Sequence, residues 1–263
     1  DFSWQSSLIY SLNRTEITNL YNQGRVIDLV QGNGFAKQGY PARALFSIPF
    51  VGINEKGNPV CINEKGQATV GDLNFQERNN TDYLIYEGST DPIYNGSLGN
   101  TFNYKGFHLN LFLTYAFGNV VRLDPVFSAK YNDLTSMTHD FKNRWMQPGD
   151  ENVTNVPGVV SRYEYEQNRT LLSTAYNAYN YTSVRTAKGD FIRLKEISLA
   201  YDFPHRWLEN SPVNNISLKL QATNLMLLYA DKKLNGQDPE FMNAGGVASP
   251  MPKQFTLTLK LGL

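Results

Sequence analysis

The last nine residues of the chain alternate strictly between apolar side chains and polar or small ones. The segment reads FTLTLKLGL from Phe255 to Leu263, with Phe or Leu at each odd position and Thr, Lys or Gly at each even one. Successive side chains of a β-strand point to opposite faces, so this period of two predicts a strand with one apolar face. The pattern raises the question of what covers that face and what pairs with the edge of the strand.

The same alternation recurs along the chain and predicts an all-β fold. The clearest case is GFHLNLFLTYAFG, residues 106–118, in which the odd positions are apolar and the even ones are mostly polar or small. Lys105-Gly106 joins it to the alternating segment 101–104 and suits a tight hairpin. Pro204 marks the end of a strand, because proline has no amide proton for a strand ladder. Further strands are predicted at 2–12, 195–203, 216–223 and 255–263.

Two shifts of parity interrupt this alternation. Apolar positions are even up to Leu194 and odd from Ile197, and in the next strand they are even up to Ala222 and odd from Leu225. A shift by one residue turns every following side chain to the other face. If the two strands pair around a turn at 204–213, both shifts lie at the same level. We interpret them as bulges where the strands leave an apolar medium; the alternative is a pair of unrelated bulges.

The remaining segments are long, polar and rich in Asn, Gly and Tyr. They cover 54–96, 118–188 and 230–252, and the sequence gives few strand signals in them. Loops of this length are uncommon inside compact domains. They are typical of outer-membrane barrels, in which short turns on one side alternate with long extracellular loops on the other. The order of short and long connections therefore favours a transmembrane barrel over a soluble sandwich.

Two interpretations of the apolar face compete. In a soluble β-sandwich or barrel it would form an internal core, and in a transmembrane barrel it would contact lipid. Lys219 and Lys260 both fall on the other face, and a Lys facing lipid would cost about 2–4 kcal/mol at the bilayer midplane. Aromatic residues also lie near strand ends, as at membrane interfaces. The lipid-facing residues predicted in this way are Phe107, Leu109, Leu111, Leu113, Ile197, Leu199, Tyr201, Leu218, Leu220, Phe255, Leu257, Leu259, Leu261 and Leu263.

Composition narrows the classes of function. The 263 residues carry 24 basic and 24 acidic side chains, and a net charge of zero argues against a nucleic-acid-binding protein. No apolar run is long enough for a transmembrane helix, but a strand needs only about 9–11 residues to cross. Cys61 is the single cysteine, so neither an internal disulfide nor a thiolate metal cluster is expected. A chain that begins and ends in strand alternation is expected to be a piece of something longer.

Catalytic motifs are absent from the sequence. His108, His139 and His205 are far apart and form no zinc-binding pair. There is no phosphate-binding glycine loop and no nucleophile elbow, and the acidic residues are scattered. We therefore expect no enzymatic activity, no cofactor and no metal site.

The candidate binding surface is the long segment 118–188. Aromatic rings flanked by hydrogen-bonding side chains suit sugar rings or extended peptides. The alternative is that these side chains pack the loops on each other or on a partner protein, with the Arg and Trp as structural contacts. The candidates for contact with substrate or partner are Arg144, Trp145, Tyr163, Tyr165, Tyr176, Tyr179 and Tyr181.

Several stretches, in order, resemble one family. They are DPIYNGSLGNTFNYKGFHLNLFLTYAFGN (91–119), the Arg-Trp pair at 144–145, GDFIRLKEISLAYDFP (189–204), ISLKLQATNL (216–225) and GQDPEFMNAGGVASPMPKQFTLTLKLGL (236–263). Together they are similar to the C-terminal end of SusC/RagA-type TonB-dependent outer-membrane transporters. Residues 1–90 agree more loosely.

The resemblance implies a barrel of about 22 antiparallel strands around a plug domain. Residues 1–263 would then form the C-terminal part of the barrel, about its last seven strands, without the plug and the first strands. It further implies import of oligosaccharides or peptides across the outer membrane of a Gram-negative bacterium. The implied partners are the rest of the transporter, a SusD-like surface lipoprotein, the TonB complex acting through the missing N-terminal part, and the lipid bilayer.

Two departures from the family are visible. Family members often have a calcium-loop-like stretch near the position of 77–83, but here the first acid is Glu77 and the glycine is missing. Because such a loop needs glycine for its sharp turn, we expect no calcium there. The chain also ends in Leu263, where many outer-membrane barrels end in an aromatic residue.

The competing hypothesis is an autonomous soluble β-rich module, such as a carbohydrate-binding or adhesin domain. Such a module would bury its apolar faces internally and fold alone in water. We predict instead that residues 1–263, expressed alone and without detergent, show no cooperative thermal unfolding transition by circular dichroism. A soluble monomer with a single sharp transition would contradict the membrane interpretation.

Overall fold

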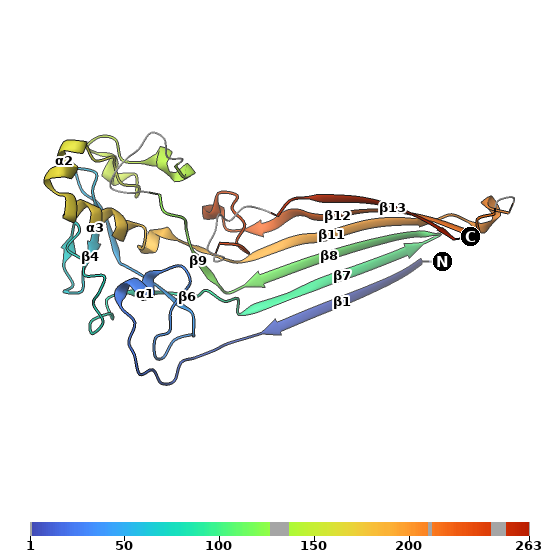
Figure 1. Cartoon of the computed structure of the whole chain (residues 1–263), viewed down its shortest axis with the longest axis horizontal. Helices are drawn as coiled ribbons and strands as arrows, with labels where there is room; N and C mark the ends of the chain where they lie inside the picture. Colours follow the sequence, from blue (N-terminus) through green and yellow to red (C-terminus); the bar gives the residue numbers. More distant parts are fainter. Residues whose placement is uncertain (1, 127–136, 210–211, 243–250, 263) are drawn as a thin grey trace.

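The structure is a computed structural model that describes residues 2–126, 137–209, 212–242 and 251–262. One antiparallel six-stranded sheet dominates it, with the folded loops gathered at one end (Figure 1). The strand order is β1-β7-β8-β11-β12-β13, so β1 and β13 are the edges of the sheet in the described chain. The strands are β1 (Phe2–Leu12), β7 (Tyr94–Tyr104), β8 (Phe107–Phe117), β11 (Phe191–Asp202), β12 (Asn215–Ala230) and β13 (Gln254–Gly262).

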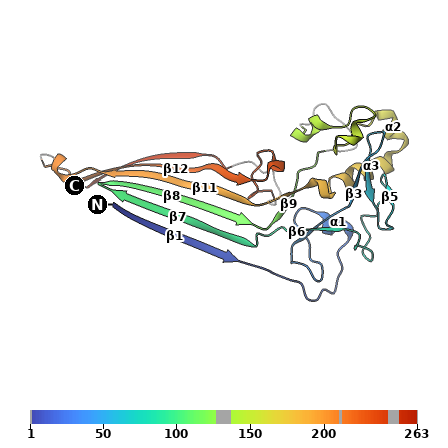
Figure 2. The ribbon, with the colours of Figure 1, turned by 180° about the vertical axis from the view of Figure 1, so that it is seen from behind.

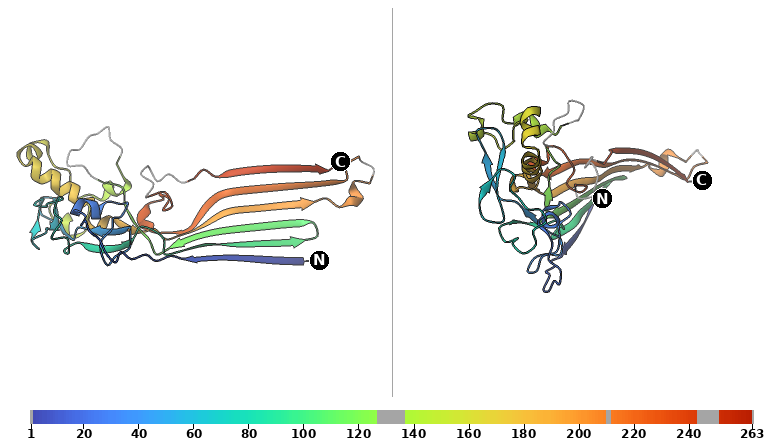
Figure 3. Two further views of the ribbon diagram at one scale, coloured as in Figure 1. Left: turned by 60° about the horizontal axis from the view of Figure 1, so that its bottom comes forward. Right: turned by 60° about the vertical axis from the view of Figure 1, so that its left-hand side comes forward.

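The register gathers the predicted lipid-facing side chains on one face. Residues directly opposite in an antiparallel pair share a face, and Leu109 pairs with Leu199, which pairs with Leu220, which pairs with Leu257. No described element covers this row: Leu220 is 53% and Leu257 is 69% exposed. Figures 2 and 3 show the strands as one layer with no second sheet over it. Leu263 lies outside the described residues.

The opposite face is polar, as the alternation predicts. His108 lies across from Asn103 and Ala200, and its Nε2 is 2.9 Å from the Asp202 carboxylate. Lys219 pairs with Thr258 on the same face. The sheet therefore separates an apolar side from a side lined by hydroxyl, amide and charged groups.

Both parity shifts are bulges at the same level. The pairing of β11 with β12 jumps between Leu194 and Glu196, so Lys195 is left outside the ladder, and β12 passes from Met226 to Thr223 at that step. Asn224 takes a left-handed conformation there, with φ of 54°. Asparagine tolerates this region better than most residues. The prediction of paired bulges is confirmed.

The segments predicted as long loops contain more regular structure than expected. One small sheet pairs β2 (Ala44–Ser47) with β6 (Ile85–Ser89), and another pairs β9 (Val120–Arg122) with β10 (Thr186–Lys188). A third has the order β3 (Phe50–Ile53), β4 (Pro59–Ile62), β5 (Ala68–Thr69). The helices are α1 (Val26–Val30), α2 (Arg162–Gln167) and α3 (Arg169–Tyr179). Short 3-10 turns are η1 (His139–Asn143), η2 (Asp150–Asn152), η3 (Ser183–Arg185), η4 (His205–Trp207) and η5 (Lys232–Leu234).

The fold class is thus mostly strand, antiparallel and with little helix. The large sheet has six strands in the described residues, so the expected count of about seven is not confirmed. Strand β7 begins at Tyr94, earlier than the predicted 101–104, within a stretch rich in Gly, Asn and Ser. Among the described residues, no helix has the length and apolar character needed to cross a membrane.

Helix α3 organises the core of the loop region. Its buried residues Leu172, Ala175, Tyr176 and Tyr179 recur at three- and four-residue spacing, which is the period of an amphipathic helix. They pack with Val126 and neighbouring side chains in one cluster, and α1 packs against β2 in another that contains Cys61. Burial raises the pKa of the Cys61 thiol to about 12, so this thiol is inert near neutral pH.

A buried arginine joins the loop segments to the end of the sheet. Arg122 donates hydrogen bonds to the carbonyl oxygens of Val30 (3.1 Å), Phe46 (2.7 Å) and Thr182 (2.8 Å). Burial lowers its pKa to about 10, which still leaves it charged at neutral pH. Because the three carbonyls come from separate parts of the chain, this one side chain fixes α1, β2 and η3 relative to β9.

The loop region also contains a short tandem repeat. The sequence INEKG occurs at 53–57 and again at 62–66. In each copy the Asn side chain accepts two backbone N–H bonds, Asn54 from Lys56 and Asn58, and Asn63 from Lys65 and Gln67. The glycines have φ of 80° and 75°. The two copies therefore form matching hairpin turns between β3, β4 and β5.

The bulge at Asn224 generates a test of the fold. Replacing Asn224 with Val puts a β-branched side chain in the left-handed region, which costs about 1–2 kcal/mol. Asn224→Gly removes that strain and should differ from the native protein by less than about 1 kcal/mol. Thermal unfolding of the detergent-solubilised protein measures both variants. Equal stability of the two would show that the backbone at this bulge is not left-handed.

Candidate functional site

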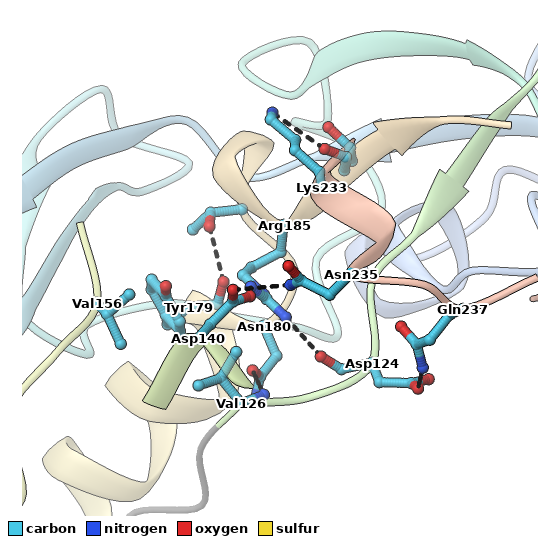
Figure 4. Close-up of polar contacts among 12 residues, drawn as sticks. Asp124, Val126, Asp140, Val156, Tyr179, Asn180, Arg185, Lys233, Asn235 and Gln237 are labelled. Carbon is cyan, nitrogen blue, oxygen red and sulfur yellow. Dashed lines mark hydrogen bonds and ion pairs between the residues drawn. The ribbon is translucent and has the colours of Figure 1, made fainter. Parts of the chain in front are cut away.

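A cavity of about 220 Å³ lies where the sheet meets the folded loops. Four segments distant in sequence converge on it, from the end of β9, from η1, from η3 and from η5 (Figure 4). Its lining residues are Leu123, Asp124, Thr138, His139, Asp140, Arg185, Lys233, Asn235 and Gln237. It is the best candidate for a binding site in the described chain because most of its lining is polar or charged and drawn from separate elements.

Arg185 holds the cavity together. Its side chain is 5% exposed and forms an ion pair with Asp140 at 2.7 Å. Its other terminal nitrogen donates to the backbone carbonyl of Asp124 at 2.6 Å. The Asn235 amide donates to the second oxygen of Asp140 at 3.0 Å. Asp140 and Arg185 thus fix each other and tie η1 and η3 to the segment after η5.

The segment 231–242 forms one wall of the cavity and is itself anchored to the sheet. Leu234 is fully buried against Val121 and Leu123. Arg193, on the polar face of β11, forms a buried ion pair with Asp238, with the two side chains 4% and 0% exposed. Two charges taken out of water need such direct pairing. The lining residues Lys233, Asn235 and Gln237 are therefore carried by a fixed segment.

The lining suits a polar ligand that offers donors, acceptors and charge. Asp124 and Asp140 balance Arg185 and Lys233, so the charged side chains around the cavity sum to zero. The Lys233 Nζ donates one hydrogen bond to the Thr186 carbonyl oxygen at 3.2 Å. The Thr138 hydroxyl is buried without a hydrogen-bond partner among the described residues. No Tyr, Phe or Trp is among the described lining residues, so a sugar ring finds no aromatic platform here.

Two of the predicted contact residues belong to the core of the loop region. Tyr176 and Tyr179 are each 1% exposed on the inner side of α3. The Tyr176 hydroxyl donates to the carbonyl of Gly158 at 2.6 Å. Burial and this bond support the alternative stated from the sequence, in which such tyrosines pack the loops on each other.

Arg144 and Trp145 also make internal contacts. The Arg144 guanidinium lies 4.4 Å from the centre of the Phe141 ring. The Trp145 indole packs against the backbone of Gly57 and Gly158, where an added Cβ would be 2.4 Å and 2.8 Å from the ring. Its N–H donates to Glu151 at 2.9 Å and holds the pKa of that carboxyl below its usual value. This bond stabilises the loop at neutral pH and is lost as the pH falls through the lowered pKa.

The other three tyrosines differ in exposure. Tyr163, on α2, is 75% exposed and free to contact substrate or partner. Tyr165 packs partly on the α3 cluster. Tyr181 packs partly on the α1 cluster, with its ring centre 6.1 Å from that of Phe75. Of the predicted set, Tyr163 is therefore the best candidate for an external contact.

The segment 77–83 uses its acidic side chain on its own backbone. One oxygen of Glu77 accepts N–H bonds from Arg78, Asn79 and Asn80 at 3.0, 2.7 and 3.2 Å. The bonds from Asn79 and Asn80 are the main cause of a lowered pKa for this carboxyl. The carboxylate thus closes a local turn.

The contribution of the contact between Trp145 and Gly57 to stability can be tested with two matched glycine-to-alanine variants. Gly57→Ala strains the backbone by about 1–2 kcal/mol and also displaces the indole. Gly66→Ala strains an equivalent turn in which a new Cβ meets nothing within 4 Å. We predict a larger loss of thermal stability for Gly57→Ala, by at least about 1 kcal/mol. The same loss in both variants would mean that the ring contact contributes nothing.

Comparison with known proteins finds no protein-family model that matches the chain. Among curated proteins it is similar to TonB-dependent receptors of Formosa agariphila. It is 27% identical to receptor P39 over 192 residues (68% of this chain, 17% of the receptor) and 23% identical to receptor P3 over 261 residues (91% and 23%). It is 24% identical to receptor P26 over 288 residues (99% and 27%). The chain thus spans about a quarter or less of these relatives' length.

Solved structures show the same fold. The RagAB peptide transporter aligns with a TM-score of 0.67 and 19% identity, over 99% of this chain and 27% of that one. The RagAB peptide importer in the 'closed-closed' state aligns with a TM-score of 0.68 and 20% identity, over the same shares of both chains. The chain is therefore related to the TonB-dependent receptors, and the resemblance to SusC/RagA-type TonB-dependent transporters predicted from the sequence is confirmed.

Proposed function

We propose that this chain forms part of the barrel wall and outer vestibule of a TonB-dependent nutrient importer in the outer membrane. The observation that carries the proposal is the two-faced sheet, with an extended, mostly apolar face that no described element covers. A soluble protein rarely exposes an apolar surface of this extent, whereas a transmembrane sheet requires it. The soluble carbohydrate-binding or adhesin module is not favoured, because its core would need a covering layer on this face.

Aromatic side chains mark both ends of the apolar face. Tyr104 and Phe107 lie at the end of the sheet where the tight hairpin joins β7 to β8, which we call the hairpin end. Tyr10 and Tyr115 lie at the opposite end, next to the folded loops, which we call the loop end. Eight residue steps separate Phe2, opposite Tyr104, from Tyr10. These steps span about 27 Å along a strand, or about 21 Å along the membrane normal at a tilt of about 40°. This height agrees with an apolar band of about 25 Å flanked by aromatic girdles.

The polar face of the sheet would line the interior of the barrel. The remaining strands and the plug domain would come from parts of the transporter that precede this segment, and the TonB complex would act through them. The folded loops would form the extracellular vestibule beneath a SusD-like lipoprotein. RagAB is described as a peptide importer with 'open-open' and 'closed-closed' states, and the shared fold supports a similar opening and closing here.

The cavity beside Arg185 favours peptides over neutral oligosaccharides as substrates. Charged groups of both signs and side-chain amides complement the termini, side chains and backbone of a peptide. The tyrosines that would stack on sugar rings are mostly packed inside the loop region. The Lys233 amine, the Thr138 hydroxyl and the Arg185 Nε–H are lining groups with hydrogen-bonding capacity to spare in the described structure.

Substrate binding by the solubilised transporter and its lipoprotein partner tests this assignment. We expect Lys233→Ala to weaken binding of mixed peptides by about tenfold, corresponding to about 1.4 kcal/mol, in isothermal titration calorimetry. Lys233→Arg should retain most of the affinity. Lys232→Ala, a neighbouring lysine outside the cavity lining, is the control and should have no effect. Unchanged affinity in Lys233→Ala, or binding of neutral oligosaccharides alone, would contradict the assignment.

A further inference from the structure

The polar face of the sheet is interrupted by an exposed aromatic ring, that of Phe112 on β8. The residues of β8 that share this face with it include His108, Asn110 and Thr114, all polar. Phe112 pairs with Gly99 on β7 and with Glu196 on β11, so these three residues lie side by side. The Phe112 side chain is 39% exposed, and no described aromatic ring packs on it. An aromatic side chain at a position that otherwise carries polar groups needs an explanation.

Gly99 leaves one side of this ring uncovered. A Cβ atom added at Gly99 would lie 3.5 Å from Cδ2 of Phe112, in ordinary contact with the ring. Any larger side chain there would cover part of the ring, and glycine leaves that space open. An uncovered ring in contact with water attracts ligand groups that stack on it or place a positive charge on it.

The carboxylate of Glu196, on the other side of the ring, has no partner. It forms no hydrogen bond or ion pair with the described residues. Arg193, on the same face of β11, is already committed to Asp238 at 2.5 Å and to Glu240 at 3.3 Å. Lys195, the bulge residue, forms no ion pair with Glu196 either. These three carboxylates and two cations leave one negative charge in excess, which favours a cationic ligand.

The ring and the carboxylate are close enough to hold one cation between them. Opposite residues of an antiparallel pair have Cβ atoms about 4.5–5.5 Å apart. A cation is attracted to a ring within about 6 Å of the ring centre, and an ammonium or guanidinium group also donates strong hydrogen bonds to a carboxylate. The row continues from Glu196 through Thr223 and Gln254, which offer a hydroxyl and an amide to the rest of a ligand.

The row lies nearer the loop end of the sheet than the hairpin end. Gly99 is three residues from Gly96, which pairs with Tyr10 and Tyr115 at the loop end, and five residues from Tyr104 at the hairpin end. Given the barrel of the proposed function, on which this inference rests, the row lies just below the vestibule. A substrate that leaves the vestibule for the interior of the barrel therefore meets this part of the wall.

We propose that Phe112 and Glu196 form a subsite for a positively charged side chain, lysine or arginine, of an imported peptide. The cation lies against the ring in the space that Gly99 leaves and forms an ion pair with Glu196. A neutral sugar brings no charge to this subsite, and an acidic side chain is repelled by Glu196. The subsite thus gives the importer a preference for basic peptides, beyond the general capacity for peptides proposed for the cavity beside Arg185.

Peptide binding by the full transporter with its lipoprotein partner tests the subsite. The probes are two mixed octapeptide libraries that differ at one position, with arginine in one and its uncharged analogue citrulline in the other. We expect isothermal titration calorimetry to show about tenfold tighter binding of the arginine library to the native protein. Glu196→Gln and Phe112→Leu should each remove most of this preference and leave the affinity for the citrulline library unchanged.

Two controls match these variants. Asp202→Asn removes a carboxylate from the same face of the sheet at its hairpin end, and Phe107→Leu removes a ring from the opposite face of β8. Both should keep the preference for arginine. Gly99→Val retains Phe112 and Glu196 but fills the space beside the ring, so it should lose the preference as well. Heat-modifiable migration on gels shows that each variant has folded.

The outcomes distinguish failure of the subsite from failure of the proposed function. Equal affinity of the native protein for both libraries, or equal weakening of both in Glu196→Gln, would overturn the subsite. If Lys233→Ala weakens both libraries and Glu196→Gln changes neither, the peptide assignment holds and the subsite alone is wrong. If neither library binds the native protein, the peptide assignment fails and the subsite fails with it.

A thiol beside the subsite locates the bound peptide. Thr223 pairs with Glu196, and the native Cys61 of this segment is buried and unreactive. We expect Thr223→Cys in native outer membranes to react with a water-soluble methanethiosulfonate, and the arginine library to protect it better than the citrulline library. Labelling that the arginine library leaves unchanged would contradict the subsite. Absence of labelling would show that water does not reach this face, which also overturns it.

Discussion

The structure depends on antiparallel strand pairing in a register that aligns the apolar residues of neighbouring strands on one face. Each pair places opposite residues on one face, and a slip of one residue would move a charged side chain such as Lys219 to the apolar side. At the bulges at Lys195 and Asn224, the apolar positions change from even to odd along both strands. Both strands bulge at the same level, so the ladder continues beyond them.

In the folded loops at the end of this sheet, polar contacts of buried side chains fix the positions of the segments. Arg122, Arg185 and Arg193 are all nearly buried, and each bonds to a segment distant in sequence. A surface ion pair would contribute little, but buried arginines that satisfy carbonyls and carboxylates fix the geometry of long connections. The cavity owes its shape to this arrangement, because Asp140 and Asn235 meet only where Arg185 holds η1.

The sheet was largely predictable from the sequence, whereas the cavity was not. Strands such as β8 and β13 alternate cleanly, and even the bulges are visible as parity shifts. Strand β7 was only partly visible because Gly96 and Gly99 carry no side chain to mark a face. Helix α3 was missed because its inward Tyr176 and Tyr179 look like binding residues in a polar segment. Asp124, Asp140 and Lys233 come together only through tertiary contacts, and no local pattern marks them.

The carbonyl contacts of Arg122 bear on how the folded loops could be exchanged between this chain and its relatives. This arginine lies just past β8, yet it holds segments that begin almost a hundred residues earlier and sixty residues later. A chimera joined between residues 122 and 182 would separate the guanidinium from the Thr182 carbonyl, and one joined between 46 and 122 would separate it from the Val30 and Phe46 carbonyls. Junctions at Gly118 and Gly189 would transfer Arg122 with the Thr182 carbonyl but leave Val30 and Phe46 behind, so an exchange that keeps all three contacts has to begin after β1 and end at Gly189.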